Sequence, residues 1–181
     1  MNDRNTVIRS MHDLGLAVWT GGALMGAVGL NGATAKADDP TERLRLSSLG
    51  WARWAPVNAA AIAVHGVGGL GLILANRKRV AGQKGTQANT VAKTVVTLAA
   101  AGATAYAGVL GRKVDAESHQ GGQGATEPST DASPALKTAQ QHLKITQWAI
   151  PALTAVLVVM TAQQGEQQKP GQQLRDRLLS R

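Results

Sequence analysis

WAPVNAAAIAVHGVGGLGLILAN, residues 54–76, is a run of 23 residues that contains no Asp, Glu, Lys or Arg. An α-helix rises ~1.5 Å per residue, so a run of this length covers the ~30 Å hydrocarbon core of a bilayer. A helix of a soluble bundle would instead carry charge on its outward face every turn or so. The run therefore predicts a transmembrane helix.

Three further uncharged runs lie on either side of it, with 22 residues at 14–35, 18 at 94–111 and 21 at 145–165. Lys93 can extend its ammonium group toward water, which lets Val91 and Ala92 join the third span. The sequence thus predicts an all-α integral membrane bundle of four transmembrane helices, with spans at about 14–35, 54–76, 91–111 and 145–163. Together they form one transmembrane domain, residues 1–165.

The segments between and after the spans are much more polar. The outer loop at about 114–133 is rich in Gly, Ser, Gln and acidic residues, so we expect it to be disordered. Ser133-Pro134 has the pattern of a helix N-cap followed by proline, which predicts that the last helix begins there. Residues 166–181 are expected to form a polar cytoplasmic tail.

Composition excludes several classes of site and partner. Among 181 residues there is no Cys, so a disulfide framework or a Cys-ligated metal is impossible. The 19 basic and 11 acidic residues give a net charge of +8, but the basic residues are spread over the ends of the spans. Nucleic-acid binding is not expected, since that function needs a clustered basic face.

Basic residues divide unequally between the two sides of the four-span topology. Eleven lie on the side of both termini and the second loop, and eight lie on the other side. Translocation discriminates against Lys and Arg in short loops, so the eleven-residue side is predicted to be cytoplasmic. We therefore expect a plasma (inner) membrane protein with cytoplasmic N- and C-termini and the lipid bilayer as its surroundings.

The first span allows an alternative interpretation. Arg4 and Arg9 precede the apolar run, and Ala33-Thr34-Ala35 follows it. A charged start, an apolar middle and an A-x-A site are typical of a cleaved secretory signal. Cleavage of the first span is the alternative to a four-span protein.

Small residues recur at every fourth position in three of the runs. Small faces let helix backbones approach closely in lipid, so these residues are the candidates for helix packing. They are Gly22, Gly26, Ala59, Ala63, Ala99, Ala103 and Ala107.

His65 is the candidate functional residue, because it lies about ten residues into the second run and is predicted near the midplane. A titratable side chain at that depth is a functional candidate by default. The alternative is a structural imidazole that forms a hydrogen bond with a Thr or with Tyr106. Around it, residues 66–71 match G-x-G-x-x-G, but no acidic residue occurs between Glu42 and Asp115, so a dinucleotide site is not expected.

His12 lies at the predicted cytoplasmic end of the first span, and His142 lies before the fourth span. Both are therefore expected to be about half a membrane thickness from His65. Two-histidine ligation of a haem within one protomer is not expected on this basis.

The opening of the first run, His12-Asp13-Leu14-Gly15-Leu16-Ala17-Val18-Trp19-Thr20-Gly21-Gly22, fits the pattern H-x6-W-x-G-G. It resembles the opening of several bacterial inner-membrane families, among them the copper-resistance D-like four-helix domains. The resemblance covers about a dozen residues and implies a metal or haem role for His12.

The sequence favours a small multi-pass membrane protein that acts through helix packing and protein–protein contact, with a membrane-protein partner or a second copy. No catalytic constellation is evident, because all eleven carboxylates are predicted to lie in loops or termini. The alternative is a redox or transport protein that binds haem or copper through His65 or His12.

Overall fold

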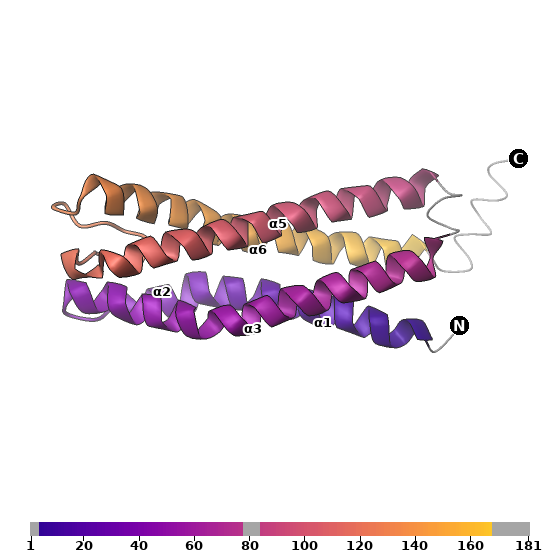
Figure 1. The fold of residues 1–181 in the computed structure, drawn as a ribbon, viewed down its shortest axis with the longest axis horizontal. Coiled ribbons are helices and arrows are strands. Elements are labelled where there is room, and N and C mark those ends of the chain that lie inside the picture. The colour runs from indigo at the N-terminus through magenta and orange to yellow at the C-terminus, as the bar shows by residue number, and fades with distance from the viewer. Residues whose placement is uncertain (1–3, 78–83, 168–181) are drawn as a thin grey trace, which may run out of the picture.

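The structure is a computed structural model of the chain and describes residues 4–77 and 84–167. Four long helical segments lie side by side in an up-down-up-down bundle (Figure 1). Helix α1, Arg4–Met25, continues through the π-helical turn η1, Gly26–Leu30, into the short helix α2, Asn31–Thr34. The other three are α3, Pro40–Ala75; α5, Lys84–Ala116; and α6, Pro134–Gln167.

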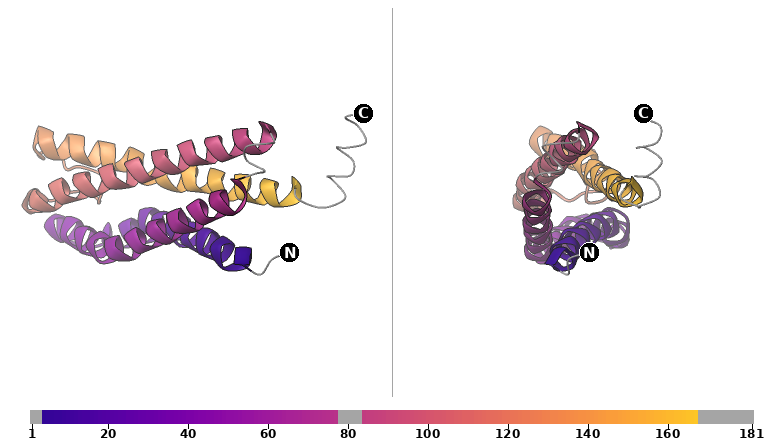
Figure 2. Two further views of the ribbon diagram at one scale, coloured as in Figure 1. Left: turned by 45° about the vertical axis from the view of Figure 1, so that its right-hand side comes forward. Right: turned by 90° about the vertical axis from the view of Figure 1, so that its right-hand side faces the viewer.

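The packing order around the bundle is α1, α3, α5 and α6. Extensive contacts join α1 to α3 and α5 to α6, while α3 and α5 contact each other less extensively. Figure 2 shows this arrangement in the end-on view. The start of α1 and the end of α6 lie at the same end of the bundle, as an even number of antiparallel helices requires.

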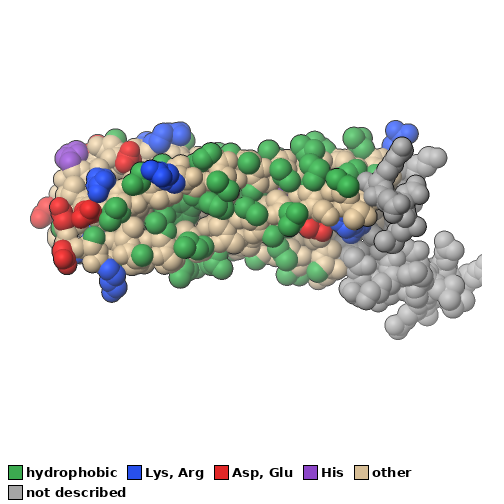
Figure 3. Space-filling view, turned by 90° about the horizontal axis from the view of Figure 1, so that it is seen from below, with side chains coloured by type: hydrophobic (Ala, Val, Ile, Leu, Met, Phe, Trp, Pro, Cys, Tyr) green, Lys and Arg blue, Asp and Glu red, His purple; other side chains and the backbone are tan. Residues whose placement is uncertain are grey.

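All four helical segments are long and apolar enough to cross a membrane, over Asn5–Thr34, Pro40–Ala75, Gly85–Ala116 and Pro134–Gln163. Large hydrophobic side chains are exposed along them, for example Leu70 at 64% and Ile145 at 68%. In Figure 3 hydrophobic side chains are spread over the middle of the molecule, and most of the charged side chains on this face gather near one end. The predicted class, an all-α bundle of four spanning helices, is confirmed.

Each helix extends beyond its predicted span. Helix α3 has 36 residues, or about 54 Å, and so exceeds the hydrocarbon core. A loss of apolar character marks the edge of the membrane and does not by itself end a helix, so α3 continues through Arg43, Arg45 and Arg53. The predicted tail, 166–181, lies outside the described residues from 168 onward.

Polar caps mark two of the helix starts. Asp39 Oδ1 accepts a hydrogen bond of 2.8 Å from the Thr41 amide, and Pro40 occupies the first turn of α3. Ser133 Oγ accepts one of 3.2 Å from the Leu136 amide, and α6 begins at Pro134. The predicted start of the last helix is confirmed.

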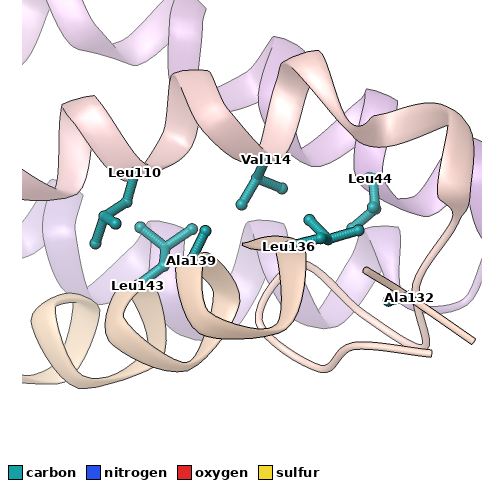
Figure 4. Packing of buried hydrophobic residues seen from close by; sticks show 7 residues of the cluster. All are labelled: Leu44, Leu110, Val114, Ala132, Leu136, Ala139 and Leu143. Carbon is teal, nitrogen blue, oxygen red and sulfur yellow. The ribbon is translucent and has the colours of Figure 1, made fainter. Parts of the chain in front are cut away.

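Two clusters of buried side chains hold the helices together. Figure 4 shows the first, at the end away from the termini, which joins α3, α5 and α6 through Leu44, Leu110, Val114, Ala132, Leu136, Ala139 and Leu143. The second lies nearer the middle and contains Trp19, Ala23, Ala100 and Ile150. Both are small, because most of the apolar surface faces outward.

The loop between α5 and α6 differs from the disorder expected for residues 114–133. Ser118–Gln120 form a 3-10 turn, and Gly122 donates a hydrogen bond of 3.1 Å to the Pro40 carbonyl. The buried Gln140 side chain donates to the carbonyls of Gly124 and Ala125, at 3.0 and 3.2 Å. A composition rich in small residues led to the prediction of disorder. In the structure, the small Gly and Ala side chains instead let this backbone pack closely on α3 and α6.

Candidate functional site

The centre of the site is the crossing of α1 and α3, where two backbones touch through glycine. A Cβ on Gly15 would lie 2.6 Å from the His65 amide nitrogen, and one on Gly68 would lie 2.8 Å from the His12 Cα. No ordinary side chain fits at either position. Glycine on both helices therefore fixes this crossing, as expected for close packing in lipid.

Both helices carry the same local pattern, a histidine followed three residues later by the glycine. His12 of α1 packs on Gly68 of α3, and His65 of α3 packs on Gly15 of α1. The two imidazole rings meet with their centroids 4.2 Å apart and their planes at 38°. The antiparallel crossing thus turns two separate H-x2-G motifs into one histidine pair.

The distance expected between these two histidines was wrong. His65 is ten residues from the end of α3 at Ala75, and His12 is eight residues from the start of α1 at Arg4. At ~1.5 Å per residue, both are about 12–15 Å from the same end of the bundle. The prediction placed His12 at the membrane edge because the uncharged run that defined the first span begins directly after Asp13.

Hydrogen bonds orient both rings. His65 Nδ1 lies 2.9 Å from the His12 carbonyl oxygen, and His12 Nδ1 lies 2.9 Å from Asp13 Oδ1. Carbonyl and carboxylate oxygens only accept, so each Nδ1 carries the hydrogen. In the neutral rings each Nε2 is then an acceptor.

The partner of His65 differs from the Thr or Tyr106 that the structural interpretation proposed. Tyr106 lies on α5 in the other half of the bundle, where its hydroxyl is 2.7 Å from His142 Nδ1 on α6. The hydrogen bond of His65 to a backbone carbonyl on α1 could not be read from residue types. It follows from the glycine contacts that bring the two backbones together.

Trp19 supports the histidine pair from the side. It is fully buried, and its ring meets that of His65 edge-on with centroids 6.1 Å apart. Its indole Nε1 donates a hydrogen bond of 3.2 Å to Thr104 Oγ1 on α5. Trp19 therefore connects α1, α3 and α5, and no sequence pattern indicated that Thr104 was its partner.

A cavity of about 260 Å³ adjoins the histidines on the side of α5. Arg9 and Asp13 line it from α1, and Lys93 lines it from α5. Threonines at Thr86, Thr90, Thr94, Thr97 and Thr161 add hydroxyl groups, and Leu70, Leu72, Ile73 and Leu98 add apolar surface. With neutral histidines, the two cations and one carboxylate leave one net positive charge.

Asp13 is a further difference from the sequence-based expectation. It was assigned to the terminal region outside the spans, but the structure places it within α1, in the segment long enough to cross a membrane. It contacts His12 and lines the same cavity as Lys93. A carboxylate thus lies beside cationic side chains within the spanning segments.

The residues do not fit a haem held between His12 and His65. A haem held between two imidazoles would separate them by the macrocycle, whereas these rings are in contact, with centroids 4.2 Å apart and planes tilted by 38°. Nor, in the described part of the chain, do three or more His, Asp or Glu side chains gather into a metal-binding group. Copper would find two imidazole nitrogens, fewer than the three protein ligands typical of His-rich catalytic metal sites.

The predicted packing residues fall into two groups. Gly22 and Gly26 of α1 receive the indole rings of Trp54 and Trp51, and Ala103 and Ala107 pack against the central cluster. In contrast, Ala59, Ala63 and Ala99 are exposed and do not belong to either buried cluster, and Ala59 lines a cavity between α3, α5 and α6. The packing face of α3 instead contains Ala61, His65 and Gly68, which the four-residue spacing did not select.

These features define a class, a helical protein with four helices long and apolar enough to span a membrane and a polar cavity within the bundle. No family model, curated protein or solved structure matches the chain. The copper-resistance D-like resemblance of residues 12–22 therefore stays an expectation. The residues that carry this resemblance share one face of the helix, since His12, Trp19 and Gly22 all lie on the face of α1 that contacts α3.

Proposed function

We propose that this chain is a multi-pass plasma-membrane protein without catalytic activity that binds an anionic phospholipid with a hydroxylated head group in the histidine cavity. The observation that carries the proposal is the set of side chains gathered in one cavity from three helices, Arg9, Lys93, His12 and His65. Basic pockets between transmembrane helices on the cytoplasmic side are typical sites for anionic head groups.

The chemistry of the lining specifies the head group further. Arg9 and Lys93 supply cationic donors for a phosphate. The two Nε2 atoms are acceptors in the neutral rings, so they suit a ligand that also donates from hydroxyl groups. Leu70, Ile73 and Leu98 line the same cavity and suit the start of the acyl chains. Phosphatidylglycerol combines these properties.

The test is lipid binding to the full chain in detergent, measured by native mass spectrometry. We expect dioleoyl phosphatidylglycerol to bind more tightly than phosphatidic acid, which lacks the glycerol hydroxyls, or phosphatidylcholine, which has no net charge. Lys93→Gln should weaken phosphatidylglycerol binding about tenfold, because a hydrogen bond to a charged group contributes roughly 1.5–3 kcal/mol. Lys113→Gln, at the far end of α5, is the matched control.

Equal affinity for phosphatidylglycerol and phosphatidylcholine would rule the proposal out. So would an equal effect of the Lys93 and Lys113 substitutions. Tighter binding of phosphatidic acid than of phosphatidylglycerol would retain the anion site and reject the role of the histidines. Thermal unfolding of each variant separates loss of binding from loss of fold.

A second candidate function is contact with another transmembrane helix, through helix packing that extends outside the bundle. The exposed Ala63 of α3 favours it, because small residues on an outward face allow a neighbouring helix to approach. Under this candidate, Ala63→Leu should shift the chain from oligomer to monomer in light scattering coupled to size-exclusion chromatography. Gly102→Leu, at an exposed position of α5 where an added Cβ would meet no atom within 4 Å, shows whether bulk alone has the same effect.

A further inference from the structure

A second cavity, of about 440 Å³, lies in the other half of the bundle, between α3, α5 and α6. Trp51, Trp54 and Asn58 line it from α3. On α5 its wall includes Gly108 and Gly111, where an added Cβ would meet no atom within 4 Å. The space therefore exists because α5 presents glycine where it faces α3. Its volume is within the range of small-molecule sites, ~300–1,000 Å³.

Two residues that line this cavity each contain a buried polar atom without a hydrogen-bond partner in the described part of the chain. Trp54 Nε1 and Asn58 Oδ1 are buried, and no described residue forms a hydrogen bond with either. They are four residues apart on α3 and so lie on one face of the helix. The neighbouring Trp51 differs, since its Nε1 donates a hydrogen bond of 2.9 Å to Asn31 Oδ1. Burying an unpaired donor or acceptor costs about 1–3 kcal/mol for each group. A ligand that forms hydrogen bonds with both atoms would remove this cost.

Two prolines add acceptors to the same cavity. Pro56 in α3 and Pro151 in α6 have no amide hydrogen. The carbonyls four residues before them, on Ala52 and Gln147, therefore lack their intrahelical donor. Both Ala52 and Gln147 line the cavity. The cavity thus offers acceptors beside the unpartnered indole donor, so a ligand that both donates and accepts suits it.

We propose that this second cavity binds an uncharged lipid that carries hydroxyl groups, of the acylglycerol class. A hydroxyl donates to acceptors such as Asn58 Oδ1 and accepts from Trp54 Nε1, whereas an ester or ether group can only accept. Arg112 and Asp115 line the cavity together and balance each other in charge, which favours an uncharged head group. Ala55, Ile62 and Ile150 supply apolar walls for an acyl chain.

The test compares two lipids with the same acyl chain on the full chain in detergent, again by native mass spectrometry. Monooleoylglycerol should bind about tenfold more tightly than methyl oleate, which has no hydroxyl group. Trp54→Phe, which removes only the indole donor, should reduce this preference to about twofold. Trp148→Phe is the matched control, because Trp148 is 53% exposed on the outside of α6.

Equal binding of the two lipids to the unaltered chain would overturn the proposal without any variant. An equal effect of the Trp54 and Trp148 substitutions would also overturn it, since water would then satisfy the buried pair. Lys93→Gln should leave monooleoylglycerol binding unchanged, because Lys93 lines the other cavity. The proposal of the second site is therefore tested independently of phosphatidylglycerol binding.

Discussion

At the scale of single residues, the absence of a side chain decides where functional groups meet. Gly15 and Gly68 let the α1 and α3 backbones touch, and this contact brings His12 and His65 to 4.2 Å between ring centroids. The positions of the two imidazole rings depend on the glycines, because each histidine packs against the glycine of the other helix. Within the G-x-G-x-x-G match at residues 66–71, two of the three motif glycines pack against α1, with Gly68 against His12 and Gly71 against Ile8.

The first prediction tests this contact with two nearby glycines. Gly68→Ala should destabilise the bundle by about 1–3 kcal/mol, because the new methyl group overlaps the backbone of His12. Gly66→Ala should have little effect, because its Cβ would meet no atom within 4 Å. The measurement is thermal unfolding of each variant in the same detergent. Equal stability of the two variants would show that the helices do not touch at Gly68.

At the scale of helices, hydrogen bonds between spans supplement the small apolar clusters. Trp19 of α1 donates to Thr104 of α5, and Thr104 in turn donates to the Ala100 carbonyl at 2.9 Å. Asn31, just after the π-helical turn, donates to Gln147 of α6 at 2.6 Å and accepts from Trp51 of α3. These polar contacts join helices that lie on different sides of the bundle.

The second prediction is a double-mutant cycle on the pair formed by Trp19 and Thr104. Trp19→Phe and Thr104→Val should each destabilise the protein by about 1 kcal/mol. Combined, they should cost less than the sum of the two, because both remove the same hydrogen bond. Unfolding by denaturant in detergent gives the three free-energy differences. Strict additivity would contradict the bond, and Trp148→Phe controls for loss of an indole at an exposed position.

The sequence was sufficient to predict the four helices, but it was insufficient to predict which residues form the contacts between them. Uncharged runs predict spans because bilayer thickness sets their length, and Ser133-Pro134 predicted the start of α6. Spacing of small residues found Gly22 and Gly26 but also Ala59 and Ala63, which are exposed. Because a helix in lipid is apolar on every side, hydropathy does not reveal which face meets a neighbour. Predicting that His12 pairs with His65 would have required knowing which faces of α1 and α3 meet.

At the scale of the whole molecule, one end of the bundle differs from the other. The histidine cavity lies toward the end that holds the start of α1 and the end of α6, and the second cavity lies toward the loop between α5 and α6. With cytoplasmic termini, the two proposed lipid sites would face different leaflets. A phosphate site facing the cytoplasm also agrees with the basic residues counted on that side.

The last prediction concerns this orientation. Reporter fusions after Lys84 and after Arg181 should give a cytoplasmic signal, and a fusion near Gly121 should give an outside signal. The reason is the distribution of eleven basic residues on the terminal side against eight on the other. A cytoplasmic signal at Gly121 would reverse the topology and move the histidine cavity to the outer leaflet.

Mass spectrometry of the intact protein tests the alternative that the first span is a cleaved signal, since loss of residues 1–35 would identify that cleavage. That loss would remove His12 together with Gly15, so the histidine pair can exist only in the chain that keeps its first span.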